Sequence, residues 1–127
     1  MVREVKKEGT LYALHIAHDV QGTMPVSDAL WPLQMLMIER SAGSVFPAHM
    51  HRLEDRQTTS LQEALVVLSG RIEVTIYTRD AGVVESFEMG ANECVFLVSG
   101  GWGITVLEDA RMYEFKNGPH HDDKVML

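Results

Sequence analysis

The sequence predicts an all-β fold, a sandwich or a barrel, and three observations support this prediction. Residues 71–78 alternate strictly between apolar and polar side chains, which is typical of a strand with one buried face. Residues 64–68 are apolar at every position, odd and even, as in a strand that is covered on both faces. Short strand-like segments recur along the chain, and no long stretch has helical periodicity.

The individual elements follow from the same pattern. The first strand is expected at residues 10–18, and Ser69-Gly70 is expected to form the tight turn of a hairpin between the two segments above. Gly, Asn, Asp and Ser separate most of the other expected strands, which are residues 33–40, 83–89, 93–98, 104–107 and 111–116. The least strand-like pieces are residues 21–29 and 52–62, and residues 117–127 are expected to form a loose tail.

Length and charge restrict the class of protein. A chain of 127 residues is expected to form one domain, residues 1–127. Its net charge of -7 and scattered Lys and Arg residues disfavour nucleic acid and anionic membranes as partners. No apolar run reaches the roughly 20 residues of a spanning helix, so we expect a soluble protein. The single cysteine, Cys94, excludes an internal disulfide and suggests a buried free thiol in a cytoplasmic setting.

The strongest functional signal is a His-x-His pair, His49 and His51. On a strand, residues i and i+2 project from the same face, so both imidazoles could reach one metal ion. Five residues separate Gly43 from His49, and six separate Glu63 from Gly70.

This pattern of a glycine, a His-x-His pair, a glutamate and a closing glycine resembles the first conserved motif of the cupins. The second cupin motif is similar to residues 90–103, so the resemblance covers about residues 33–116, with the N-terminal strand and the tail outside it. The chain looks most like small single-domain bacterial cupins with a Gly-Gly-His-Gly turn and a Lys-x-Gly-Pro segment, here residues 116–119. The resemblance implies a small jelly-roll β-barrel, a double-stranded β-helix, that pairs as a homodimer.

Two departures from the cupin pattern concern the expected metal site. Eleven residues lie between His51 and Glu63, so residues 52–62 are expected to form a longer loop at the mouth of the barrel. Trp102 stands where the third histidine would be, and an indole N–H offers a metal no lone pair.

The remaining set of His49, His51 and Glu63 suits a divalent metal such as zinc, iron, nickel or manganese, with open positions for substrate. The alternative is that both histidines are satisfied by hydrogen bonds and that Glu63 pairs with Arg56 or Arg71. We identify no catalytic side chain. The residues expected to line the pocket or mouth are Arg56, Gln62, Trp102, Met35 and Met37, although the two methionines are most simply core filler.

Other histidines are weaker candidates. His15 and His18 are three residues apart on a strand and should point to opposite faces, which disfavours joint ligation. His120, His121 and the following acidic residues lie in a polar terminal run that is most simply solvated.

Two functional classes follow. The first is a metal-dependent enzyme, an isomerase, epimerase or dioxygenase, acting on a small polar molecule such as a sugar, sugar nucleotide or keto acid. The second is a non-catalytic module that binds a small molecule or a partner. We also expect a homodimer, because a second copy could cover the apolar strands at residues 12–16 and 64–68.

Overall fold

The computed structural model describes all 127 residues and contains eight strands and no helix, which confirms the all-β prediction. The strands are β1 (Val2–Lys7), β2 (Thr10–Ala17), β3 (Gly22–Pro25), β4 (Leu36–Glu39), β5 (Glu63–Tyr77), β6 (Val83–Met89), β7 (Glu93–Leu97) and β8 (Gly101–Lys116). Because it has no helix, the structure has none that is long and apolar enough to cross a membrane.

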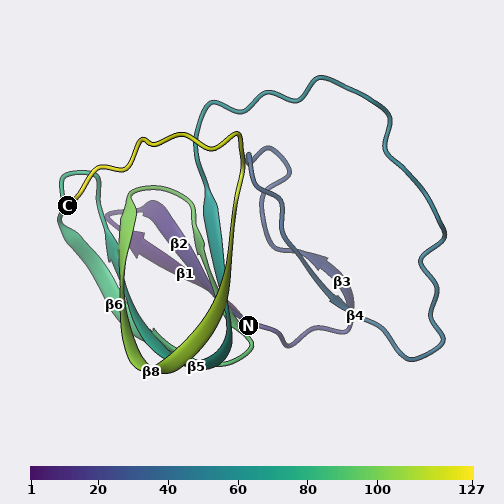
Figure 1. The fold of residues 1–127 in the computed structure, drawn as a ribbon, viewed down its shortest axis with the longest axis horizontal. Helices are drawn as coiled ribbons and strands as arrows, with labels where there is room; N and C mark the ends of the chain where they lie inside the picture. The colour runs from purple at the N-terminus through teal and green to yellow at the C-terminus, as the bar shows by residue number, and fades with distance from the viewer.

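Six of the strands form one antiparallel sheet that curls into a half-barrel (Figure 1). The order is β1-β2-β7-β5-β6, and β8 pairs with β5 along almost its whole length. The first and last strands of this order, β1 and β6, meet through side chains. Arg3 of β1 contacts Glu85 of β6 at 2.6 Å, and Lys7 Nζ donates to the Val83 carbonyl at 3.1 Å. The curl therefore closes on one side, while β8 borders the other.

The prediction of a hairpin at Ser69-Gly70 is wrong, because one long strand, β5, runs through these residues. Residues 64–68 and 71–78 were expected to reverse at Ser69-Gly70, but the chain continues through these residues in one strand. The pairing of β5 with β8 shifts register three times between Val67 and Ile72, so the two-stranded ribbon bends there instead of turning back. The first half of β5 then pairs with β7, and the second half pairs with β6.

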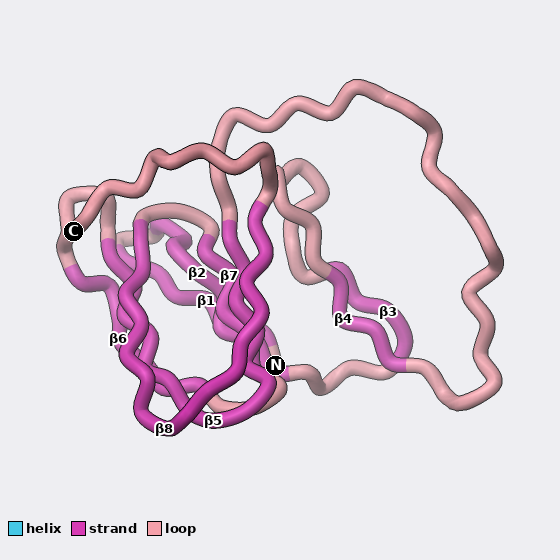
Figure 2. The backbone as a smooth tube through the Cα atoms, viewed as in Figure 1, coloured by secondary structure: helices cyan, strands magenta, loops and turns pink.

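The other strand predictions differ in how well they match. Strands β2, β6 and β7 lie within the expected ranges, to within one residue. The ranges 104–107 and 111–116 are parts of the single strand β8, because both pair with β5. Strand β4 is shorter than residues 33–40, and neither β1 nor β3 was foreseen. The strand on which His49 and His51 were expected does not form, since residues 45–59 have no regular structure (Figure 2).

Two apolar clusters hold the fold together, one on each face of the sheet. The cluster inside the curl joins residues of β1, β2, β5, β6 and β7, with Val5, Val67, Val74 and Val95 fully buried. Strands β3 and β4 pair with each other as a separate antiparallel hairpin. The cluster on the outer face lies beneath this hairpin, where Met37 packs with Ile16 and Phe96. Of the apolar segments that a second copy was expected to cover, residues 12–16 and 64–67 are largely buried within one copy, whereas Leu68 is 44% exposed.

Cys94 belongs to this outer cluster and is a buried free thiol, as expected. Burial raises its pKa to about 12, since the apolar surroundings disfavour the thiolate.

Candidate functional site

His49 and His51 lie on the exposed connection between β4 and β5, residues 40–62, which we call the long connection. Their ring centroids are 5.9 Å apart, and His49 Nδ1 lies 2.7 Å from the Pro47 carbonyl oxygen. A carbonyl only accepts, so Nδ1 donates and the lone pair of Nε2 stays free. A histidine that ligates a metal commonly has this arrangement.

Glu63, the third predicted ligand, is separated from this pair. It begins β5, where its neighbours are Leu97 on one side and Lys116 on the other. No group of three His, Cys, Asp or Glu side chains is close enough to hold a metal ion. As placed, the three residues are not gathered into one group, since the histidines lie on the exposed long connection and Glu63 lies in β5, so the metal site stays a prediction.

The carboxyl group of Glu63 has a raised pKa. Partial burial is the main cause, the negative charge of Glu114 adds to it, and Lys116 opposes it. The arginines expected as alternative ion-pair partners of Glu63 do not contact it either. Arg71 pairs with Glu88, and Arg56 forms no ion pair.

We expect Glu63→Gln to stabilise the protein at pH 7 and to have little effect at pH 4. A raised pKa means that the folded state holds the proton more tightly than the unfolded chain, whose ordinary value is 4.5. Stability is therefore lost as the pH rises through the window between 4.5 and the folded pKa. Urea unfolding at both pH values measures the effect. It should shrink in a Glu114→Gln background, and an unchanged effect there would remove Glu114 as a cause.

Most of the residues expected at the mouth of a barrel pack in the fold instead. Trp102, in β8, lies opposite Ile76 of β5 and packs against the cluster inside the curl. Met37 is buried in the outer cluster, and Met35 packs against it, so both methionines are core filler. Arg56 is exposed on the long connection, while Gln62 is buried and its backbone N–H donates to Asn117.

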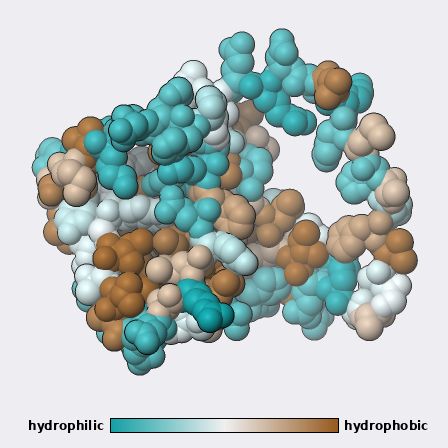
Figure 3. Space-filling view, viewed as in Figure 1, coloured by the Kyte–Doolittle hydropathy of each residue, from teal (hydrophilic) through white to brown (hydrophobic).

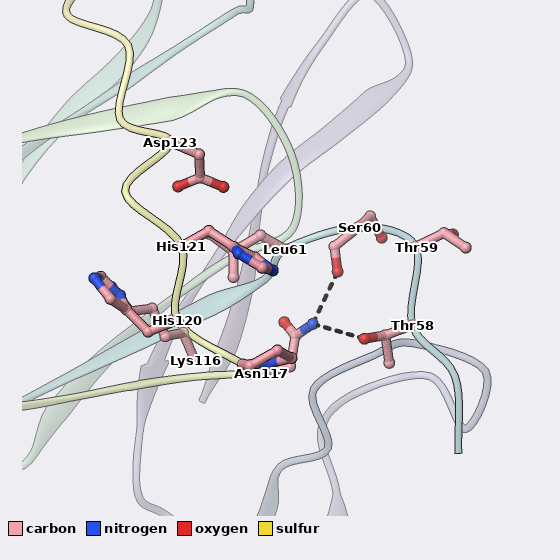
Figure 4. A pocket seen from close by; sticks show the side chains of 11 residues that line it. Thr58, Thr59, Ser60, Leu61, Lys116, Asn117, His120, His121 and Asp123 are labelled. Atoms are coloured by element: carbon pink, nitrogen blue, oxygen red, sulfur yellow. Dashed lines mark hydrogen bonds between the residues drawn. The ribbon is translucent and has the colours of Figure 1, made fainter. Parts of the chain in front are cut away.

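Asn117, which accepts from the Gln62 backbone N–H, lines a pocket of about 400 Å³ that sequence reasoning did not identify (Figure 4). One wall is residues 58–61, near the end of the long connection, and the other is Lys116, the last residue of β8, with residues 117–121 and Asp123 of the C-terminal tail. Asn117 joins the walls: its Nδ2 donates to Thr58 Oγ1 at 3.2 Å and to the Ser60 carbonyl at 2.9 Å. Of the 11 lining residues only Leu61 is hydrophobic, and the polar ones include Lys116, His120, His121 and Asp123.

A second polar group that sequence reasoning missed surrounds His15. This side chain is buried, donates from Nε2 to Glu93 at 2.7 Å, and accepts at Nδ1 from Arg3 at 3.3 Å. Its ring stacks on Phe87 with centroids 4.7 Å apart. Every polar atom of the ring is thereby satisfied, so we assign His15 a structural role. His18 is exposed, and its Nε2 donates to the Ile38 carbonyl at 3.1 Å.

No protein-family model, no curated protein and no solved structure matches the chain. The structure by itself defines the chain as an all-β protein with a curled antiparallel sheet.

Proposed function

We propose that the protein is a non-catalytic, cupin-like binding module that holds a small polar molecule in the pocket between residues 58–61 and 116–123. The observation that carries this proposal is the polar lining of the pocket at a volume of about 400 Å³, within the usual range for small-molecule sites. The inside of the curl is less suited to a polar ligand, because the buried apolar cluster lies there.

The lining favours a hydroxylated or acidic ligand, such as a sugar or a keto acid. Thr58, Thr59 and Ser60 supply hydroxyl groups that both donate and accept hydrogen bonds. Lys116 supplies a positive charge, and the imidazoles of His120 and His121 supply further donors. Asp123 is the one acidic residue of the lining, and it suits a sugar hydroxyl better than a carboxylate.

Calorimetric titration with a simple sugar, a sugar nucleotide and a keto acid tests the proposal. We expect saturable binding of one class, weakened at least fivefold by Asn117→Ala, because that change removes the hydrogen bonds that join the two walls. His121→Ala should also weaken binding, whereas His18→Ala, far from the pocket in sequence, should not. No binding at millimolar ligand, or equal binding by all three variants, would reject the pocket.

A metal-dependent enzyme is the second candidate, and the free Nε2 of His49 beside His51 favours it. In that case both histidines would hold a zinc, iron, nickel or manganese ion, and Glu63 would complete the set only if the long connection moved toward β5. Elemental analysis of protein purified without a histidine tag tests this candidate. Metal at one equivalent that disappears in the His49→Ala, His51→Ala double variant would support it, and metal unchanged in that variant would reject it.

A further inference from the structure

Strand β8 has one edge that pairs with no other strand, although the side chain of Leu127 lies against Gly101 at the start of the strand. Its 16 residues pair only with β5. Neither the backbone hydrogen bonds outside the regular pairing nor the side-chain hydrogen bonds reach its other edge. An open strand edge is a template for pairing with another strand, and proteins usually cover or charge it.

Both faces of β8 also expose apolar side chains. Ile104 and Val106 lie opposite core residues of β5 and are 37% and 55% exposed. On the other face Tyr113 and Phe115 are 60% and 54% exposed. Apolar side chains gather over the bend of the β5–β8 ribbon in Figure 3, at lower left. This edge therefore has unpaired backbone and apolar surface in the same place.

The long connection contains a segment with the matching properties. Residues 44–53, which we call the arm, are all exposed, and Met50 and Leu53 are 92% and 102% exposed. The hydrogen bonds, ion pairs and ring contacts of the arm stay within residues 40–54. In Figure 1 the long connection swings out in a wide loop, away from the half-barrel.

Charge and size make the arm and β8 complementary. Residues 41–53 contain Arg52, which pairs with Glu54 at 3.2 Å, and two histidines but no Asp or Glu. Strand β8 carries three acidic residues, Glu108, Asp109 and Glu114, against two basic ones. The arm has ten residues and β8 has 16, together within the roughly 20 to 30 residues per side of a stable interface. Pro47 lacks an N–H, but it is compatible with a strand that becomes the new edge.

We propose that the arm of one copy adds as a strand to the β8 edge of a second copy, and that the second arm does the same in return. A two-fold exchange of this kind covers both open edges with one interface. It also explains why the arm stands clear of its own barrel although both ends of the long connection are held, by Arg40 against Thr23 and by Asn117 against Thr58. This inference does not depend on the pocket.

Light scattering of the full chain at micromolar concentration gives the first test. We expect twice the monomer mass of 14.2 kDa. The double variant Met50→Asp, Leu53→Asp should raise the dissociation constant of the dimer at least 100-fold, because it places two charges against β8. Leu30→Asp is the matched control, since Leu30 is 93% exposed outside the arm, and it should change the constant less than threefold. A monomeric wild type, or equal effects of the two variants, would overturn the proposal.

A photo-crosslinking side chain at position 50 gives the second test and identifies the occupant of the edge. Mixed copies labelled with light and heavy nitrogen should yield a covalent dimer whose linked peptides join position 50 of one copy to residues 101–116 of the other. A link to residues 101–116 of the same copy would show that the chain's own arm covers β8. A link to any other surface, or none, would likewise reject the exchange.

Discussion

Gly70→Ala is expected to lower the free energy of unfolding by about 3 kcal/mol, because two separate costs meet at this position. Gly70 has a φ of 83°, in the left-handed region that an alanine adopts only at a cost. A Cβ there would also lie 2.1 Å from the carbonyl oxygen of Asp109, a backbone atom of β8 that cannot move without breaking the ribbon. Urea unfolding monitored by circular dichroism measures the loss.

Gly9→Ala is the matched control for this change. Gly9 has a φ of 78°, but nothing lies within 4 Å of the position of its Cβ. Only the conformational cost remains, which is about 1 kcal/mol. Equal losses in the two variants would mean that the close approach of β5 and β8 at the bend does not exist.

Phe96→Ala is expected to cost about 4 kcal/mol, as is usual when a fully buried aromatic side chain is removed. Phe96 is 0% exposed, and its ring lies 5.7 Å from that of Trp31, between β7 and the segment before β4. The change would leave a cavity in the outer cluster and loosen the β3–β4 hairpin. Chemical unfolding gives the loss, and limited proteolysis within residues 18–35 shows whether the hairpin detaches.

Phe115→Ala is the control for Phe96→Ala, since both phenylalanines flank Ala64 in the sheet. Phe115 is 54% exposed within one copy, so its removal should cost about 1 kcal/mol or less when measured in the Met50→Asp, Leu53→Asp variant, in which no second copy covers β8. A cost as large as that of Phe96→Ala in that variant would show that Phe115 is buried by its own chain.

The sequence by itself determined the strands whose signal is local. The alternation at residues 71–78 and the short segments of β6 and β7 specify their strands, because side chains on a pleated strand alternate between two faces whatever lies around them. The burial of Cys94 could also be predicted from the sequence, because an apolar run follows it directly in the chain.

Only the tertiary structure decided where those strands go and which side chains meet. Ser69-Gly70 has the composition of a tight turn, but pairing with β8 on both sides of it favours a bend in one strand over a reversal. Contacts between distant residues left no local pattern: His15 meets Glu93 across 78 residues, and Asn117 meets Thr58 across 59. The His-x-His pair shows the same limit, since spacing defines which residues share a strand face only once a strand has formed, and residues 45–59 form none.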